Sequence, residues 1–164
     1  MKKILLFVFY IAISCHVSTV KAQGNADALM KQGQEFLANK EYVKARSTFL
    51  HAFNAFVAKG QSDKATYCGT RVASLYYREN YYKEAFDILR AADQCIVQGE
   101  QRNNSQRPDL RYATTKERLQ MYTRMRKASS AAEQISRLDA YANAAANDSL
   151  NKDLLYTKAS HYYT

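Results

Sequence analysis

The chain carries the same spaced set of small and bulky residues twice, with an offset of 40 residues. The first set is Leu29, Gly33, Phe36, Tyr42, Ala45, Phe49 and Ala52. Adding 40 to each number gives the second set, which is Gly69, Ala73, Tyr76, Tyr82, Ala85, Leu89 and Ala92. A period of this length indicates an array of helix pairs, each burying its apolar face against its neighbours. The sequence therefore predicts an all-α fold.

Small residues recur where two antiparallel helices would come closest. Two backbones in contact need small side chains at the crossing and bulky apolar side chains where gaps must be filled. The small residues are Gly33, Ala45 and Ala52 in the first copy, and Ala73, Ala85 and Ala92 in the second. This alternation predicts one helical hairpin in each copy.

The pattern resembles the tetratricopeptide repeat, whose small and bulky residues follow the same order. This chain departs from the family in its residues: it has no Trp, and Val57 and Val97 stand where the family has its usual Pro. Its period also exceeds the family's length of about 34 residues, which predicts longer helices or turns. The resemblance implies a right-handed solenoid of about three and a half antiparallel helical hairpins.

Polar and glycine residues mark where the first predicted helices begin and end. We expect Asn39 to cap the second helix and Gly60 to end it. Ser62 is expected to cap the third helix. Asn80 then caps the fourth helix, and Gly99 closes it.

The second half of the chain continues the pattern after a polar loop over 99–107. Pro108 fits the first turn of the fifth helix, because its missing N–H has no partner to lose there. Ser130 and Glu133 form a capping box for the sixth helix. A turn then leads to a seventh helix that begins near Leu150.

Helices five and six form a third repeat, and helix seven opens a fourth. The expected repeat bounds are about 26–60, 66–99 and 112–146, with a partial repeat over 152–164. The last helix carries apolar residues on a face that its own pair would cover. We therefore expect this sequence to be the N-terminal part of a longer protein; the alternative is that helix seven is a terminal cap on the third repeat.

The start of the chain has the pattern of a secretory signal peptide. Two lysines precede an apolar run over 4–13, and Val20 and Ala22 occupy the two positions that a signal peptidase reads. A retained membrane anchor is the first alternative, but the run is far shorter than the roughly 20 residues of a membrane span. Lipidation of Cys15 is the second, but the residues before it fit that cleavage pattern badly. We expect residues 1–22 to be removed, leaving a periplasmic or otherwise extracytoplasmic chain.

Two cysteines, Cys68 and Cys95, remain in the expected mature domain over 23–164. Exported proteins meet an oxidising compartment, in which paired cysteines often form disulfides. Cys68 falls early in one predicted helix and Cys95 late in its antiparallel partner, so a disulfide between them is one alternative. Two buried thiols that pack as small apolar side chains are the other.

The resemblance also implies candidate binding residues, because the first helix of each tetratricopeptide pair lines a concave groove. In the third repeat the matching positions include Ala113, Lys116 and Gln120. Over the three repeats, the matching positions that carry a Tyr, Arg or Lys are Tyr67, Tyr77, Arg78, Lys116 and Arg124. Tyr and Arg are favoured binding anchors, since each joins a large contact area to hydrogen-bonding groups. For any one of these residues, the alternative is ordinary surface or tyrosine packing.

Positive charge is concentrated in one segment of the chain. Loss of three lysines with the signal peptide lowers the net charge from +9 to +6, and the segment 102–127 alone carries +6. This predicts an acidic protein or peptide partner, or an anionic membrane surface, with a solvated helix face as the alternative. A basic stripe is also typical of nucleic-acid binding, but export argues against that partner.

No residue pattern points to catalysis or to a cofactor. Neither His51 nor His161 has a Ser, Cys or carboxylate at a spacing typical of a catalytic dyad or triad, and no metal-ligand cluster or phosphate-binding loop is present. We expect a non-enzymatic, exported module that binds a protein or peptide. The chain resembles the extracytoplasmic repeat region of bacterial membrane-bound sensor histidine kinases, which implies membrane attachment through a further C-terminal part. The alternatives are a stand-alone periplasmic scaffold or, with residues from elsewhere, an enzyme.

Overall fold

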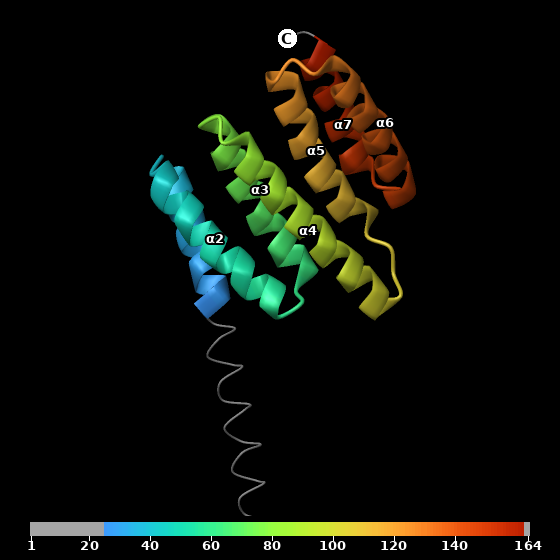
Figure 1. Cartoon of the computed structure of the whole chain (residues 1–164). Helices are drawn as coiled ribbons and strands as arrows, with labels where there is room; N and C mark the ends of the chain where they lie inside the picture. Colours follow the sequence, from blue (N-terminus) through green and yellow to red (C-terminus); the bar gives the residue numbers. More distant parts are fainter. Residues whose placement is uncertain (1–24, 163–164) are drawn as a thin grey trace, which may run out of the picture.

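The computed structural model describes residues 25–162 (Figure 1). The expected signal peptide over 1–22 lies outside the described residues. A first helix covers residues 25–38. The six that follow are α2 (Tyr42–Ala58), α3 (Ser62–Arg78), α4 (Tyr82–Asn103), α5 (Pro108–Arg124), α6 (Ala128–Ala145) and α7 (Asp148–Tyr162). Within 25–162 there is no β-strand, so the predicted all-α class is confirmed.

The helices begin at regular intervals along the chain. Helices α2, α3 and α4 begin at Tyr42, Ser62 and Tyr82, and α5, α6 and α7 begin at Pro108, Ala128 and Asp148. Each series therefore has a spacing of 20 residues, and the 40-residue sequence period corresponds to two helices. Between the two series α4 is longer, with 22 residues where α3 and α5 have 17 each. This extension shifts the register of the second series.

Four of the interhelix turns share one backbone geometry. In each turn a single residue has positive φ: Lys40 at 61°, Gly60 at 64°, Asn80 at 68° and Arg126 at 55°. The N–H of the next residue donates to a carbonyl five residues back, as in the bond of 2.9 Å between Glu41 and Phe36. This is the Schellman turn, which satisfies the last carbonyls of a helix.

The Schellman turns explain why the predicted N-caps are wrong. Asn80 occupies the positive-φ position of its turn instead of capping α4. The residues that precede α2, α3, α4 and α6 make no side-chain capping bond. Asn39 lies inside a turn, Ser62 is the first residue of α3, and Ser130 lies inside α6. Because backbone bonds set the direction of the chain, each helix starts two residues after the positive-φ residue.

Gly99 does not end α4 as predicted, because the helix continues to Asn103. A Cβ on Gly99 would stand 2.6 Å from Oγ of Ser62, so the glycine allows α3 to pack closely against α4. The positive φ of Asn104, 48°, ends the helix. The polar loop is therefore shorter than predicted and covers residues 104–107.

The remaining boundaries agree closely with the sequence. Pro108 lies in the first turn of α5, as predicted. Gly60, two residues after the last residue of α2, adopts positive φ and ends the helix as predicted. The last helix starts at Asp148 rather than near Leu150, because Oδ1 of Asn147 accepts a hydrogen bond of 2.9 Å from the Ser149 N–H.

Consecutive helices pack side by side along an elongated stack (Figure 1). In addition, α3 contacts α5 and α5 contacts α7, so these three helices form a continuous row. The buried apolar side chains fall into three clusters along the stack, centred on Phe49 and Phe53, on Leu89 and Met121, and on Leu119 and Leu138. None of the helices in the described part of the chain is both long and apolar enough to cross a membrane.

Candidate partner-binding groove

Polar side chains join the three helices of the row. The Tyr77 hydroxyl on α3 donates a hydrogen bond of 2.6 Å to Oε1 of Gln120 on α5. Nζ of Lys116, also on α5, lies 2.6 Å from Oδ1 of Asp153 on α7. These contacts hold the facing surfaces of the row in register.

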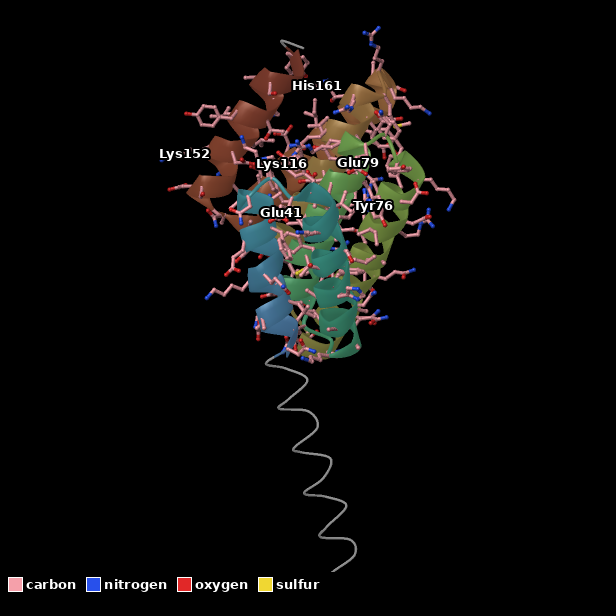
Figure 2. The ribbon with its side chains drawn as sticks, turned by 90° about the vertical axis from the view of Figure 1, so that its left-hand side faces the viewer. Glu41, Tyr76, Glu79, Lys116, Lys152 and His161 are labelled. Carbon is pink, nitrogen blue, oxygen red and sulfur yellow. The ribbon has the colours of Figure 1, made fainter. Side chains whose placement is uncertain are left out.

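A second contact lies farther along α5 and α7. Oγ1 of Thr123 is 2.8 Å from Nδ1 of His161. Figure 2 places His161 and Lys116 beside the α7 ribbon. The two contacts therefore fasten α7 at two points along its length.

A cavity of about 810 Å³ opens between these helices. Helix α3 contributes Tyr77, and α5 contributes Lys116, Gln120, Thr123 and Arg124. Helix α7 contributes Asp153, Tyr156, Thr157, Ser160 and His161. The walls thus combine aromatic rings, hydroxyl groups, an amide and cationic groups, which is the mixed chemistry of a binding site.

The cavity carries a surplus of positive charge. Asp153 neutralises Lys116. Arg124 and Arg126 also line the cavity, and neither forms an ion pair with an acidic side chain within residues 25–162. The guanidinium of Arg124 makes one long contact, 3.5 Å, to the carbonyl oxygen of Arg78. These two arginines therefore offer hydrogen-bond donors to an anionic group in the cavity.

Tyr77 is half-buried at the edge of the cavity. Burial raises the pKa of its hydroxyl, and the negative charge of Glu117 raises it further, against the opposing effect of Ser74 and the nearby arginines. The phenol therefore stays protonated at neutral pH and serves as a hydrogen-bond donor.

Three of the five predicted binding residues, Tyr77, Lys116 and Arg124, line this cavity together. Tyr67 lies in a separate, shallower pocket of about 250 Å³, where its hydroxyl accepts a bond of 3.0 Å from Nε2 of Gln34. The guanidinium of Arg78 lies 4.2 Å from the ring centroid of Tyr42 on α2, so its charge is directed to a different part of the surface.

Half of the eight basic side chains in the segment 102–127 are paired with acidic side chains in the fold. Arg107 pairs with Asp63 and Asp109, Arg111 with Glu100, Lys116 with Asp153, and Arg118 with Asp93. Each of these acidic residues except Asp109 comes from another helix, so the pairing depends on the tertiary fold. The positive charge left for a partner is therefore smaller than the segment's composition suggests.

Cys68 and Cys95 are both buried and both free thiols. They belong to the same apolar cluster, together with Phe53 and Phe56. Burial raises the pKa of the Cys68 thiol to about 12, with a smaller contribution from the charge of Asp27. In this structure the two cysteines therefore act as small apolar side chains.

The cavity residues on α7 were not among the predicted binding residues. The groove positions had been assigned only in the three complete repeats. Applying them to the partial fourth repeat would have selected Asp153, Tyr156 and Ser160, because these lie 40 residues after positions assigned on α5. The 40-residue period was therefore sufficient to predict these three cavity residues on α7.

No protein-family model matches this chain, and no curated protein or solved structure is significantly similar to it. Among residues 25–162 no group of three or more His, Cys, Asp or Glu side chains is placed to hold a metal ion. The function is therefore argued from the geometry of the groove.

Proposed function

We propose that this chain is a non-enzymatic, exported binding module that holds an acidic peptide segment of a partner protein in the cavity between α3, α5 and α7. The observation that carries the proposal is that Arg124 and Arg126, which form no ion pair within residues 25–162, line the wall of a cavity of about 810 Å³. A cavity of this size accommodates several side chains of an extended peptide.

Each type of wall residue has a role in this binding. Arg124 and Arg126 would hold a carboxylate of the peptide through charge-assisted hydrogen bonds. The exposed ring of Tyr156 supplies apolar contact area, while hydroxyl groups such as that of Thr157 bond to the peptide backbone. Since Lys116 is already paired with Asp153, it positions α7 rather than binding the ligand.

The row formed by α3, α5 and α7 supports a tetratricopeptide-like, right-handed solenoid as the architecture of this module. The 20-residue spacing of the helix starts and the repeated turns favour it. In such an array a groove runs along one row of helices and binds an extended segment. We propose that the module is the sensor or interaction region of a longer bacterial signalling protein. The alternative is a stand-alone periplasmic scaffold that assembles envelope proteins.

Charge reversal tests the proposal. The protein is applied to an array of peptides whose net charge varies from acidic to basic, and bound protein is measured at low and at physiological salt. We expect selective retention by acidic peptides, and loss of that retention in the double variant Arg124→Glu with Arg126→Glu. Salt should weaken the binding, because part of the charge is exposed.

A charge-matched control separates the cavity from the overall charge. The double variant Arg90→Glu with Arg137→Glu changes the net charge by the same amount at exposed sites outside the cavity. It should keep most of the binding. Equal loss in the two double variants would show that only the net charge matters and would contradict the proposed site.

A further inference from the structure

A second pocket lies between the first helix, residues 25–38, and α3. The first helix contributes Met30 and Gln34, and α3 contributes Asp63, Lys64 and Tyr67. The volume of this pocket is about 250 Å³, against about 810 Å³ for the cavity between α3, α5 and α7. It therefore has room for a single side chain rather than for a stretch of peptide.

The two charged residues of the second pocket are already paired within the protein. Asp63 forms an ion pair with Arg107. Nζ of Lys64 lies 2.6 Å from Oδ1 of Asp27. The second pocket therefore differs from the cavity, because it offers neither a free cation nor a free carboxylate to a ligand.

The Tyr67 ring forms a fixed wall of the second pocket. Its hydroxyl accepts a hydrogen bond of 3.0 Å from Gln34, and its ring packs edge-on against the buried Phe49, with 6.2 Å between the centroids. The guanidinium of Arg71 lies 5.2 Å from the Tyr67 ring centroid. Beside this ring the half-buried Met30 supplies a flexible apolar side chain that adapts to the shape of its neighbour. These walls favour an uncharged, apolar side chain.

Helix α3 connects the second pocket to the cavity. Tyr67, Arg71, Ser74 and Tyr77 follow one another at spacings of four, three and three residues, which places them along one side of the helix. Each of them is exposed or half-buried. Tyr67 lines the second pocket and Tyr77 lines the cavity, so an extended peptide can follow this side of α3 from one to the other.

The length of α3 sets the distance between the two sites. The guanidinium of Arg124 lies 3.5 Å from the carbonyl oxygen of Arg78, so a donor of the cavity stands at the end of α3. From Tyr67 to Arg78 the helix rises by about 16 Å, at about 1.5 Å per residue. An extended peptide covers roughly 3.3–3.6 Å per residue, so about five residues bridge this distance.

We propose that the second pocket is a subsite for the same partner segment, and that it takes one apolar side chain about five residues away from the acidic residues held by Arg124 and Arg126. This inference rests on the proposed function and narrows its ligand. The partner segment carries an acidic group and an apolar anchor at a fixed spacing, whereas acidic character alone gives only the weaker part of the binding.

The test uses fluorescein-labelled peptides with a Gly-Ser host sequence, uncharged ends and two adjacent Glu residues. One peptide has no Leu, and the others carry one Leu placed one, three, five or seven residues from the Glu pair on either side. Fluorescence anisotropy measures their binding to the protein. We expect Leu at about five residues on one side to strengthen binding at least about fivefold over the Leu-free peptide, because its side chain becomes buried. Leu next to the Glu pair should change binding less than about twofold.

Substitutions of Met30 assign this gain to the second pocket. Met30→Gln should remove the gain from Leu and leave the binding of the Leu-free peptide unchanged, because it places an amide in the apolar wall. Met30→Leu should keep the gain. Met125→Gln is the matched control outside both sites, and it should also keep the gain. Circular dichroism and urea unfolding check that each variant remains folded.

The outcomes separate this inference from the proposed function. If the Leu-free peptide binds through Arg124 and Arg126 but Leu adds nothing at any spacing, the subsite is overturned and the proposed function stands. A gain that is equal at every spacing, or that survives Met30→Gln, would also overturn the subsite. If no acidic peptide binds, with or without Leu, both the proposed function and the subsite are overturned.

Discussion

Phe49 packs directly on Gly33: a Cβ added to Gly33 would stand 2.9 Å from Cδ1 of the Phe49 ring. Phe49 is fully buried and belongs to the largest apolar cluster, so its ring has no room to move aside. At the equivalent place in the second hairpin, Ala73 and Leu89 belong to one cluster. The two hairpins therefore fill the same contact with different pairs, in which a smaller residue on one helix accompanies a larger one on the other.

We predict that Gly33→Ala destabilises the protein by about 1–3 kcal/mol through overpacking. This loss exceeds the gain of up to about 1 kcal/mol that alanine brings to a helix interior. Combining Gly33→Ala with Phe49→Leu recreates the pair of the second hairpin, so the double variant should lose less stability than the sum of the single variants. Urea unfolding of all four proteins measures the coupling. Strict additivity would show that the two residues do not share this contact.

Glu100 is predicted to hold the junction between α4 and α5. Its carboxylate accepts bonds from the Arg107 N–H at 2.7 Å and from Nε of Arg111 at 3.0 Å. The hydrogen bonds from Arg111 are the main cause that lowers the pKa of Glu100 below its usual 4.5. We expect Glu100→Gln to cost roughly 1–3 kcal/mol at pH 7, because it removes the charge from these bonds.

The pH dependence provides the check on Glu100. A lowered pKa in the folded state stabilises the protein above pH 4.5, and this contribution is lost as the pH falls through the folded value. The stability difference between wild type and Glu100→Gln should therefore shrink below pH 4.5. A difference that stays constant down to pH 3 would mean that the glutamate's charge has no part in it.

The ionised form of Glu117 is predicted to destabilise the folded protein, whereas the ionised form of Glu100 stabilises it. Its Oε2 is shielded from water and has no hydrogen-bond partner, and burial raises the pKa of the carboxyl from 4.5 to about 7, against the weaker opposing charges of Arg71 and Lys116. The unfolded chain loses this proton near pH 4.5 while the folded chain keeps it to about pH 7. Stability should therefore be greatest below pH 4.5, fall between the two values and level off above them.

The variant Glu117→Gln should remove this dependence. At pH 8 we expect it to be more stable than wild type by up to about 3 kcal/mol, since each pKa unit corresponds to about 1.4 kcal/mol. At pH 4 the advantage should vanish. Urea midpoints at the two pH values measure the effect, with Glu133→Gln as an exposed control that should show no such change. If the stability difference between Glu117→Gln and wild type were the same at pH 4 and at pH 8, it would contradict the shielding of the Glu117 carboxyl from water.

The 40-residue period predicts the helix pairs because the residues that repeat are the ones buried between neighbouring helices. Residues such as Ala45, Ala85 and Ala131 are fully buried where neighbouring helices meet, so a change of size there affects the core directly. The helix starts were not predicted correctly because the positive φ of residues such as Lys40 and Asn80 sets them. Lysine has no marked preference for positive φ, so its side chain gives no sign of the turn.

The candidate site could be predicted only in part, for a similar reason. Tyr77, Lys116 and Arg124 follow from repeat position, and they do line one cavity. The pairing of Lys116 with Asp153 joins residues 37 positions apart and depends on how α7 docks on α5. The tertiary structure is therefore needed to decide which positive charges remain available to a partner.

The two cysteines give a last prediction. Cys68 is fully buried and Cys95 nearly so, and the raised thiol pKa of Cys68, about 12, leaves almost no reactive thiolate at pH 8. Iodoacetamide should therefore modify neither residue in the folded protein, and both after unfolding in urea without reductant, as measured by mass spectrometry. If Cys68 and Cys95 instead form a disulfide, the unfolded protein should remain unmodified until a reductant is added. Protein produced in an oxidising compartment and protein made in a reducing cytosol should both be measured, because the compartment decides whether the bond can form.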